Sequence, residues 1–298
     1  MPELPEVEIV RRGLVPVMTG RQFLRVEQRR KDLRFPFPKG FRERLEGATV
    51  KAVERRAKYL LFRLSTGDVL LMHLGMTGRF SVVPDPQSKA VGGVTLGDYV
   101  YDTGADPAHD HAIFHMSGGG IVTYNDPRRF GFMLLVPEPE IQSHAMICKL
   151  GVEPLDENLS AGYLAQAANG RRTDLKAFLL DQRIIAGLGN IYVCEALHRA
   201  GLSPKRRAAT LAARSPAARE RRLRLVSEIR AVLHESIAAG GSTLNDYRHA
   251  DGAPGAFQES HLVYDREGDP CRQPGCPGTI RRIVQSGRST FYCPCCQT

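Results

Sequence analysis

Hydrophobic residues in the first part of the chain are concentrated in short runs that are typical of β-strands. Residues 59–64 and 69–74 form two such runs, and the turn residues Ser65-Thr-Gly-Asp follow the first of them. The stretch 84–110 is instead rich in Gly, Pro and Asp, which predicts a long exposed loop. Residues 1–137 are therefore predicted to be mainly strands.

One helix is predicted ahead of these strands. Pro5 suits the first position of a helix, and Glu6 and Glu8 place negative charge in its first turn. The hydrophobic residues of this segment recur at helical spacing: Val7, Val10, Leu14 and Val17. We therefore expect the chain to begin with a helix that has one apolar face.

The pattern changes to helical spacing after Pro137 and Pro139, which we interpret as part of a linker. The first predicted helix covers residues 174–181, and its apolar face consists of Leu175, Phe178 and Leu179. Further helices are predicted over 191–200 and over about 216–239. Glycines near residues 252 and 255 predict a loop over 240–257. The middle of the chain is therefore predicted to be helical.

The composition favours a nucleic-acid partner without proving one. The 298 residues exceed one typical domain, so we expect two domains and a small appendage. The net charge of +9 favours a polyanionic partner, although a protein that is merely basic has the same charge. The basic run 205–230 equally fits a solvated helix face. No signal peptide and no long apolar span is found, so we expect a cytoplasmic location.

Five of the cysteines lie close to the end of the chain. The spacing Cys271-x4-Cys276 followed by Cys293-x2-Cys296 resembles the two ligand pairs of a four-cysteine zinc ribbon. Cys295 leaves an alternative for the fourth ligand, and we favour Cys296 because a two-residue spacer suits a metal-binding knuckle better. A site closed by four thiolates predicts one structural Zn²⁺ that takes no part in the chemistry. The segments 279–284 and 289–292 are predicted to form a hairpin between the pairs.

The N-terminus offers a nucleophile of unusual type. A small second residue allows Met1 to be removed, which would expose the amine of Pro2. An α-amino group has a pKa near 8, so about a tenth of it is unprotonated at pH 7. A secondary amine that adds to a sugar C1′ gives an iminium that holds its charge and accepts electrons during elimination. Glu3 could serve as general acid or base. The alternative is that the segment is only a helix start.

Several motifs, in order, resemble the formamidopyrimidine-DNA glycosylase family. The opening Met1-Pro-Glu-Leu-Pro-Glu-Val-Glu is the first, and Arg55-Arg-Ala-Lys58 is similar to the segment of the family's catalytic lysine. Two motifs resemble the family's DNA-probing loops: His73-Leu-Gly-Met76-Thr-Gly and Asn125-Asp-Pro-Arg128-Arg-Phe130-Gly. The segment Gly187-Leu-Gly-Asn190 resembles its helix–two-turn–helix, and Gly287-Arg288-Ser-Thr-Phe-Tyr resembles its zinc-finger tip. Its lesion-binding loop is similar to Gly240-Gly-Ser-Thr-Leu together with Gly252-Ala-Pro-Gly-Ala-Phe257. The resemblance spans essentially the whole chain.

This resemblance implies an α+β fold. It predicts a β-sandwich with an N-terminal helix over 1–137, a linker over 138–151, a helix–two-turn–helix domain with the lesion-binding loop over 152–260, and a zinc finger over 261–298. It implies a monomer that binds damaged double-stranded DNA and has no obligate protein partner. The chain departs from many relatives in the four-residue spacer of its first cysteine pair.

The resemblance also implies roles for individual residues. Pro2 would displace oxidised purines through a Schiff base with Glu3 as proton donor, and Lys58 and Arg288 would assist proton transfer, phosphate binding and β,δ-elimination. Met76, Arg128 and Phe130 would fill the space of a flipped base. Four other residues match DNA contacts of the family: His109, Arg171, Lys176 and Asn190.

Two other functions remain open at this stage. The first is a glycosylase of the endonuclease VIII type, which prefers oxidised pyrimidines. Such enzymes typically begin with Pro-Glu-Gly, so Leu4 and the segment 240–257 favour the purine enzyme. The second is a DNA-binding zinc-ribbon protein without enzymatic activity. It would need no combination of Pro2, Glu3 and Lys58, and this combination is present.

Overall fold

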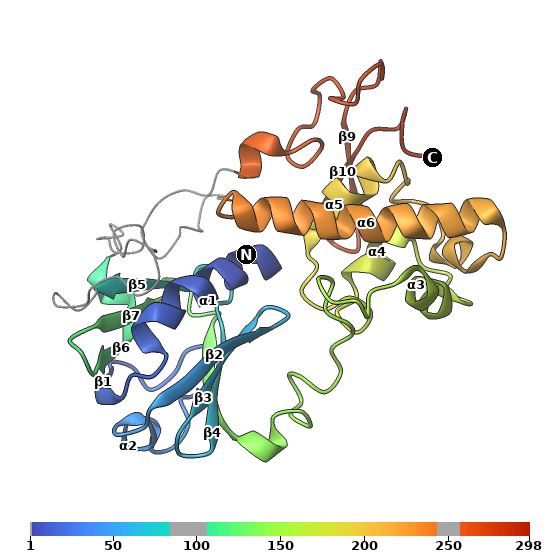
Figure 1. Ribbon diagram of the computed structural model, residues 1–298. Coiled ribbons are helices and arrows are strands. Elements are labelled where there is room, and N and C mark those ends of the chain that lie inside the picture. Colours follow the sequence, from blue (N-terminus) through green and yellow to red (C-terminus); the bar gives the residue numbers. More distant parts are fainter. Residues whose placement is uncertain (1, 84–105, 243–256) are drawn as a thin grey trace. The chain divides into compact units, whose positions relative to one another are not determined.

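The structure of the protein is a computed structural model that describes residues 2–83, 106–242 and 257–298 (Figure 1). It divides into two compact units. The first contains the described residues of Met1–Cys148 and Ala239–Ala256, and the second those of Lys149–Ala238 and Phe257–Thr298. The cysteine-rich end therefore shares a unit with the helices, and residues 239–242 belong with the strands. The finer division of the chain into the segments 1–137, 138–151, 152–260 and 261–298 stays a prediction.

Two four-stranded sheets form the first unit, and every strand pair within them is antiparallel. One sheet has the order β1-β6-β7-β5, with strands Phe23–Gln28, Asp110–Met116, Ile121–Asn125 and Arg79–Val83. The other has the order β2-β3-β4-β8, with strands Val50–Arg56, Tyr59–Leu64, Asp68–His73 and Phe132–Pro137. The two strands predicted from hydrophobic runs are β3 and β4.

A single apolar core joins both sheets and the N-terminal helix α1 (Leu4–Met18). Phe114 and Val122 come from one sheet, Phe62 and Leu70 from the other, and all are buried. The predicted apolar face of α1 packs into the same core through Val7, Val10 and Leu14. The predicted sandwich with an N-terminal helix is therefore confirmed.

The connections of the first unit include short helical turns. Helix α2 covers Phe41–Leu45, and the 3-10 turns η2 and η3 cover Pro107–His109 and Glu138–Glu140. The loop predicted over 84–110 is wrong at its end, because η2 and the first residue of β6 lie there. Residues 84–105 of this loop lie outside the described residues.

Helices dominate the second unit. They are α3 (Ala161–Ala168), α4 (Leu175–Leu180), α5 (Asn190–Arg199) and α6 (Pro216–Ala238), with 3-10 turns η4 (Ala208–Ala212) and η5 (Phe257–Ser260). Leu175, Phe178 and Leu179 are buried as predicted. Asp174 caps α4, because its side chain accepts a hydrogen bond from the Ala177 N–H at 2.7 Å. Most of the predicted loop 240–257 lies outside the described residues.

A two-stranded hairpin of β9 (Arg281–Gln285) and β10 (Arg288–Tyr292) completes the second unit. Ser286 and Gly287 both have positive φ, 49° and 72°. Two successive residues of this kind make a tight hairpin turn that matches the twist of the strands. Arg288 is therefore the first residue of β10, paired with Gln285, and lies at the tip of the hairpin.

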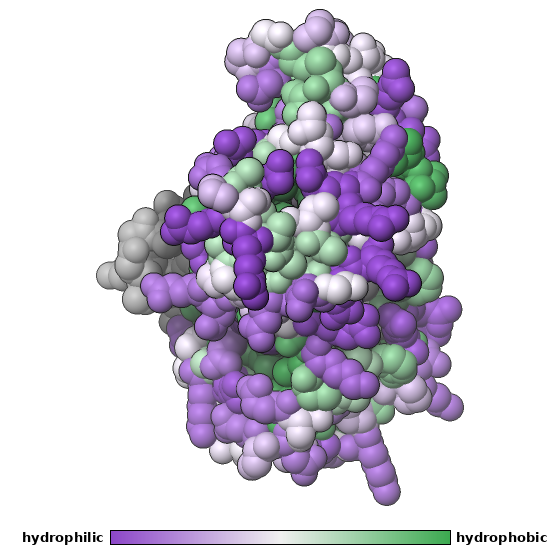
Figure 2. Space-filling model, turned by 90° about the vertical axis from the view of Figure 1, so that its right-hand side faces the viewer, coloured by the Kyte–Doolittle hydropathy of each residue, from purple (hydrophilic) through white to green (hydrophobic). Residues whose placement is uncertain are grey.

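The surface has a polar character. Hydrophilic residues predominate on the face in Figure 2, and hydrophobic residues appear there in small separate groups. Among the residues that the structure describes, no helix combines the length and the hydropathy that a membrane crossing requires.

Candidate active site and metal centre

Buried carboxylates organise the start of the chain. Pro2 is buried directly ahead of α1, and Glu3 is 3% exposed. The Glu6 carboxylate accepts a hydrogen bond from the Glu3 backbone N–H at 2.8 Å and another from the Ser242 backbone N–H at 3.0 Å. Glu6 therefore fixes the backbone beside Pro2 and attaches residues 240–242 to it. The N-terminus of α1 also carries partial positive charge, which disfavours a protonated amine there.

Arg55 holds the turn of Lys58 against α1. Its Nε donates to the Glu8 carboxylate at 3.1 Å, and its Nη1 donates to the Ala57 carbonyl at 3.0 Å. Ala57 has a φ of 53°, which produces the tight turn between β2 and β3. Lys58 follows it and is 8% exposed. A sequence-distant ion pair therefore positions the predicted catalytic lysine relative to the helix that begins after Pro2 and Glu3.

The Glu8 carboxylate is ionised throughout the neutral range. Burial opposes its ionisation, but hydrogen bonds from Arg11 and Arg12 and the charges of Arg11 and Arg55 lower its pKa to about 2. It accepts from Arg11 Nη2 at 2.8 Å and from Arg12 Nε at 3.0 Å. Glu8 is thus a charged anchor for Arg55.

A buried aspartate joins the two predicted DNA-probing loops. Asp126 has no exposed surface, and its carboxylate accepts hydrogen bonds from the Thr77 hydroxyl at 2.5 Å, the Tyr124 hydroxyl at 3.2 Å and the Gly131 N–H at 2.9 Å. Thr77 belongs to one loop and Gly131 to the other. Thr77 Oγ1 in turn accepts from the Arg128 backbone N–H at 3.2 Å. The two loops therefore form one structure.

The loops also touch through their backbones. Gly75 has a φ of 69°, and a Cβ atom on it would overlap the Phe130 carbonyl carbon and the Gly131 nitrogen. Only glycine permits this approach. The Gly75 N–H donates to His73 Nδ1 at 3.0 Å, and burial, followed by the charges of Lys58 and Arg34, lowers the pKa of His73 to about 4. A neutral His73 is therefore part of the loop.

These contacts bring the three predicted wedge residues together. Met76 is half-buried, while Arg128 and Phe130 are exposed. The Arg128 guanidinium lies 4.8 Å from the centre of the Phe130 ring. Phe130 is 44% exposed, so its ring is accessible at the surface.

His109 lies beside the same network. Its carbonyl accepts from the Asp126 N–H at 3.1 Å, and its half-buried side chain is within 4.0 Å of Asp106. His111 is buried, and its Nε2 lies 2.9 Å from the Asp126 carbonyl. The backbone of His109 thus supports the loops, and its ring remains accessible.

In the second unit, Lys176 and Asn190, which are both predicted to contact DNA, form hydrogen bonds to the hairpin of β9 and β10. The Ser289 carbonyl accepts from Lys176 Nζ at 3.0 Å and from Asn190 Nδ2 at 2.9 Å. Lys176 Nζ also donates to the Thr290 hydroxyl at 2.7 Å, and the residue has no exposed surface. Both residues therefore fix β10 next to Arg288, which is exposed. Their direct contact with DNA, and that of the exposed Arg171, stays a prediction.

Sequence reasoning missed Glu195, which lies fully buried in α5. Its carboxylate accepts from the backbone N–H groups of Leu262, Val263 and Tyr264 at 2.9, 3.0 and 2.9 Å. It thereby attaches the segment ahead of the cysteines to α5. An acidic residue inside an otherwise apolar helical stretch is the sequence signal that could have found it.

The four predicted cysteine ligands form one cluster, in which the Sγ atoms of Cys271, Cys276, Cys293 and Cys296 all lie within 4.8 Å of one another. The Cys271–Cys296 and Cys276–Cys293 sulfur distances are 3.8 and 3.6 Å. A tetrahedral zinc with Zn–S bonds of about 2.3 Å requires sulfur distances of about 3.8 Å. Cys295 is exposed and lies outside the four. The donor set therefore fits one Zn²⁺ held by Cys296 and not by Cys295.

The thiols also favour a cation on electrostatic grounds. Burial raises the pKa of both Cys271 and Cys296, and for Cys296 the neighbouring Cys293 and Cys271 raise it further, so thiolates at these positions are disfavoured without a compensating charge. A hydrogen bond from the Gly278 backbone N–H instead lowers the pKa of Cys276 to about 7. A divalent cation would stabilise all four thiolates.

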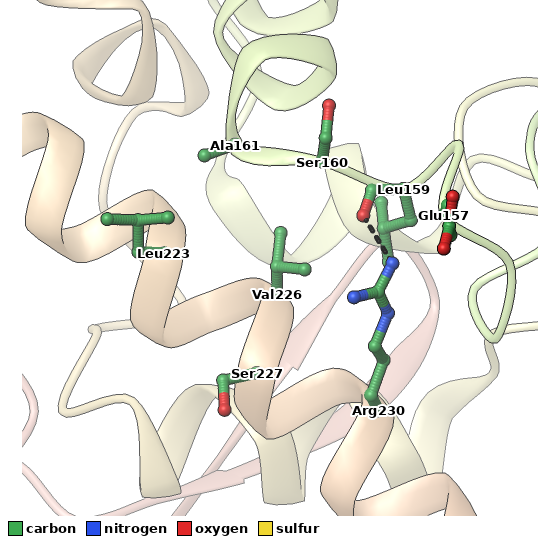
Figure 3. A pocket seen from close by; sticks show the side chains of 8 residues that line it. All are labelled: Glu157, Leu159, Ser160, Ala161, Leu223, Val226, Ser227 and Arg230. Atoms are coloured by element: carbon green, nitrogen blue, oxygen red, sulfur yellow. Dashed lines mark hydrogen bonds between the residues drawn. The ribbon is translucent and has the colours of Figure 1, made fainter.

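A surface pocket of about 420 Å³ lies elsewhere in the second unit (Figure 3). Its walls are the start of α3, with Ser160 and Ala161, and the middle of α6, with Leu223 and Val226. Arg230 closes one end by donating to the Leu159 carbonyl at 2.9 Å. None of the predicted site residues lines this pocket, so it has no part in the site.

Comparisons with known proteins agree with this arrangement. A model of the formamidopyrimidine-DNA glycosylase N-terminal domain matches residues 1–133, and a model of the H2TH domain of the same enzyme matches residues 150–248. The chain belongs to the formamidopyrimidine-DNA glycosylase family. A formamidopyrimidine-DNA glycosylase of Bradyrhizobium sp. strain BTAi1 is 56% identical over 297 residues, which cover 100% of both chains.

Solved structures of the formamidopyrimidine-DNA glycosylase family share the fold. The MutM (Fpg) protein of Thermus thermophilus has a TM-score of 0.79 and 39% identity over 99% of this chain and 98% of its own. A mutant of Lactococcus lactis Fpg in complex with DNA that contains Fapy-dG has a TM-score of 0.81 and 28% identity over 100% of both chains. The wild-type Lactococcus lactis Fpg was also solved with DNA that contains an oxidised pyrimidine, with a TM-score of 0.80 and 28% identity over 100% of both chains.

Proposed function

We propose that this protein is a bifunctional DNA glycosylase and abasic-site lyase that removes oxidised purines from double-stranded DNA during base excision repair. The observation that carries the proposal is the set of buried contacts that positions Pro2, Glu3 and Lys58 in a member of the glycosylase family.

Pro2 is the proposed nucleophile once Met1 has been removed. Its secondary amine attacks C1′ of the damaged nucleotide, the bond from C1′ to the base breaks, and the base leaves with a proton. The nitrogen then loses its own proton and forms an iminium with C1′ as the bond from C1′ to the ring oxygen O4′ breaks, and O4′ takes up a proton. Loss of a proton from C2′ expels the 3′-phosphate, and loss of a proton from C4′ expels the 5′-phosphate. Hydrolysis of the iminium returns the free amine. The partial charge at the start of α1 keeps part of the amine unprotonated at neutral pH.

Glu3 and Lys58 are the proposed proton-transfer groups. Glu3 follows the nucleophile directly in the chain and is almost fully buried, so its carboxyl group is the proposed proton donor to the leaving base. Lys58 lies in the turn that Arg55 ties to α1, and its ammonium would also contact a phosphate. The fixed backbone at both residues supports a pre-organised site.

The interlocked loops are the proposed means of base extrusion. An enzyme that acts on a base must flip it from the stack, and apolar or planar side chains that occupy the vacated space offset the lost stacking. Arg128 and Phe130 lie against each other, Met76 belongs to the loop packed against theirs, and all three are at least partly accessible. The planar guanidinium of Arg128 suits the hydrogen-bonding edge of the unpaired base.

The second unit is proposed to bind the lesion strand through phosphates. Arg288 is exposed at the hairpin tip and would contact a phosphate and assist δ-elimination. The N-terminus of α5 at Asn190 and the side chain of Arg171 are further proposed contacts of this unit, and His109 is a proposed contact of the first unit. Lys176 would act with them by holding the hairpin. We assign one structural Zn²⁺ to Cys271, Cys276, Cys293 and Cys296, where it would fix the base of the same hairpin.

Borohydride trapping on defined duplexes tests the activity. Protein with a processed N-terminus, verified by mass spectrometry, is incubated with DNA carrying 8-oxoguanine opposite cytosine or one oxidised pyrimidine. We expect covalent trapping and β,δ-elimination ends, with preference for 8-oxoguanine. Preference for the pyrimidine would move the protein to endonuclease VIII-type specificity, and no adduct on either duplex would refute the glycosylase proposal.

A matched pair of proline variants assigns the nucleophile. Pro2→Gly is expected to lower excision by at least about 100-fold, since a primary amine in a less restrained backbone replaces the secondary amine. Pro16→Ala is the control, because Pro16 is an exposed proline of the same helix. Normal turnover by Pro2→Gly, or by protein that retains Met1, would contradict the assignment.

A further inference from the structure

His198 of α5 lies against the cysteine cluster. Its Nε2 atom is 3.4 Å from Cys271 Sγ and 3.6 Å from Cys296 Sγ, both within the range of hydrogen bonds to sulfur. The residue is 3% exposed. It is separated from these cysteines by 73 and 98 positions in the sequence. A buried imidazole is therefore directed at two sulfurs of a metal site formed by another part of the chain.

We propose that the His198 Nε2–H donates a bifurcated hydrogen bond to the thiolates of Cys271 and Cys296 and thereby holds zinc in the ribbon. This inference rests on the zinc site proposed above. His198 is a positioning residue: it contacts two ligands and does not occupy a coordination position.

The chemistry of the site fixes the direction of this hydrogen bond. A metal-bound thiolate is an acceptor, so the nitrogen that faces it must carry the proton. Among the described residues, Nδ1 of His198 has no hydrogen-bond partner, so Nε2 is the ring nitrogen that the surroundings engage. The neutral ring with its proton on Nε2 satisfies both sulfurs.

The charge of the site explains why such a donor is useful. One Zn²⁺ and four thiolates carry a net charge of −2. Apolar residues pack against the cluster, including Val263, Ile280 and Phe291, and its cysteines are buried or half-buried, so water offsets only part of this charge. Backbone N–H groups of Gln273 and Gly278 contact Cys271 and Cys276 at 3.5 and 3.4 Å. His198 adds a donor from outside the ribbon, and its target Cys296 belongs to the other cysteine pair.

The same contact gives the metal a role in placing Arg288. Helix α5 contacts the ribbon at both ends: Asn190 at its start donates to the Ser289 carbonyl, and His198 near its end contacts the metal-binding sulfurs. Gln297 adds a third connection, since it accepts from the Cys293 N–H at 2.7 Å and donates to the Leu202 carbonyl at 2.9 Å. Loss of the contact between His198 and the two cysteines should therefore weaken the attachment of the zinc ribbon to α5.

Zinc release from two variants tests the proposal. His198→Phe keeps a planar ring and removes the donor, whereas His198→Gln keeps an N–H donor near the position of Nε2. Zinc transfer to a colorimetric chelator is followed after zinc content is measured by elemental analysis. His198→Phe should release zinc roughly 10- to 100-fold faster than the wild type. His198→Gln should stay within a few-fold of the wild-type rate. Equal rates for His198→Phe and the wild type would overturn the proposal, and equally fast release by both variants would show that ring packing alone matters.

Measurements on the metal-substituted protein are independent of activity, and the ¹¹³Cd²⁺ measurement needs no variant. In the Co²⁺ form, the thiolate-to-metal charge-transfer bands should shift in His198→Phe, because the hydrogen bond withdraws electron density from sulfur. In the ¹¹³Cd²⁺ form of the wild type, a scalar correlation between the metal and the Nε2 proton is expected. A wild-type ring with its proton on Nδ1 would overturn the proposal. Wild-type protein that contains no zinc would instead refute the proposed metal site.

Discussion

Replacing Gly75 by alanine tests whether the contact between the two loops of the first unit controls base excision. The matched control is Gly67→Ala. Both glycines have positive φ, 69° and 82°, but a Cβ atom at Gly67 would meet no atom within 4 Å. Left-handed backbone costs an alanine about 1–2 kcal/mol at either position. A reduced entropy of the unfolded chain offsets part of this cost, so Gly67→Ala should lose about 1 kcal/mol.

The additional effect at Gly75 follows from the packing of the loops. A Cβ atom there would lie 2.7 Å from the Phe130 carbonyl oxygen, whereas unstrained contact needs about 3.5 Å. The Phe130 backbone must therefore move by roughly 1 Å, and such overpacking adds about 1–3 kcal/mol. The midpoint temperature of thermal unfolding should fall by about 8 °C for Gly75→Ala and by about 3 °C for Gly67→Ala.

Single-turnover excision of 8-oxoguanine is the decisive assay. A displacement of about 1 Å in residues that position the substrate can cost up to about 100-fold in rate. Gly75→Ala should therefore lose about 10- to 100-fold in the single-turnover excision rate at a temperature where it remains folded, and Gly67→Ala should match the wild type. Excision by Gly75→Ala within twofold of the wild type would refute the coupling of the loops to catalysis. An equal loss in Gly67→Ala would show that general instability is responsible.

Three further changes have expected outcomes. The pKa of His73 is about 4 in the folded protein and 6.5 in the unfolded chain, so the unfolded chain binds more protons between pH 4 and pH 6.5. This difference contributes about 3 kcal/mol to the free energy of unfolding, which is fully present above pH 6.5 and is lost as the pH falls to 4. His73→Asn should flatten this pH dependence of stability, as measured by chemical denaturation at each pH. Lys176→Met should lower stability by about 2 kcal/mol and weaken DNA binding in a filter assay, whereas exposed Arg172→Met should leave stability unchanged. Glu195→Ala should lower the free energy of unfolding by about 3 kcal/mol because three backbone donors lose their acceptor. Glu235→Ala, which removes a half-exposed carboxylate from its ion pair with the largely buried Arg199, should lower it by less, about 1 kcal/mol, as measured by thermal unfolding.

Each of these outcomes has a clear opposite. An unchanged pH dependence in His73→Asn would mean that another group causes the acid transition. A stable Lys176→Met protein with normal DNA affinity would contradict the role assigned to the buried ammonium. A loss in Glu235→Ala as large as that in Glu195→Ala would show that burial does not distinguish the two carboxylates.

The sequence by itself determined the elements whose signal is local. Helical spacing of Val7, Val10 and Leu14 predicted α1, and apolar runs predicted β3 and β4, because burial of one face follows from residue order. The cysteine spacing predicted the metal-binding pairs, since two ligands of a knuckle are neighbours in the chain. The order of motifs indicated the family. Roles of individual residues, including Pro2 and Arg288, stay predictions.

Only the tertiary structure decided the contacts between segments that are distant in sequence. It showed Lys176 buried beneath the hairpin, although a lysine after a helix cap is usually solvated, because two acceptors of β10 meet its ammonium. It grouped Asp126 with Thr77 and Gly131, and brought His198 to Cys271 and Cys296. Hydrogen bonds of this kind depend on the packing of whole elements, which no periodicity along the chain encodes.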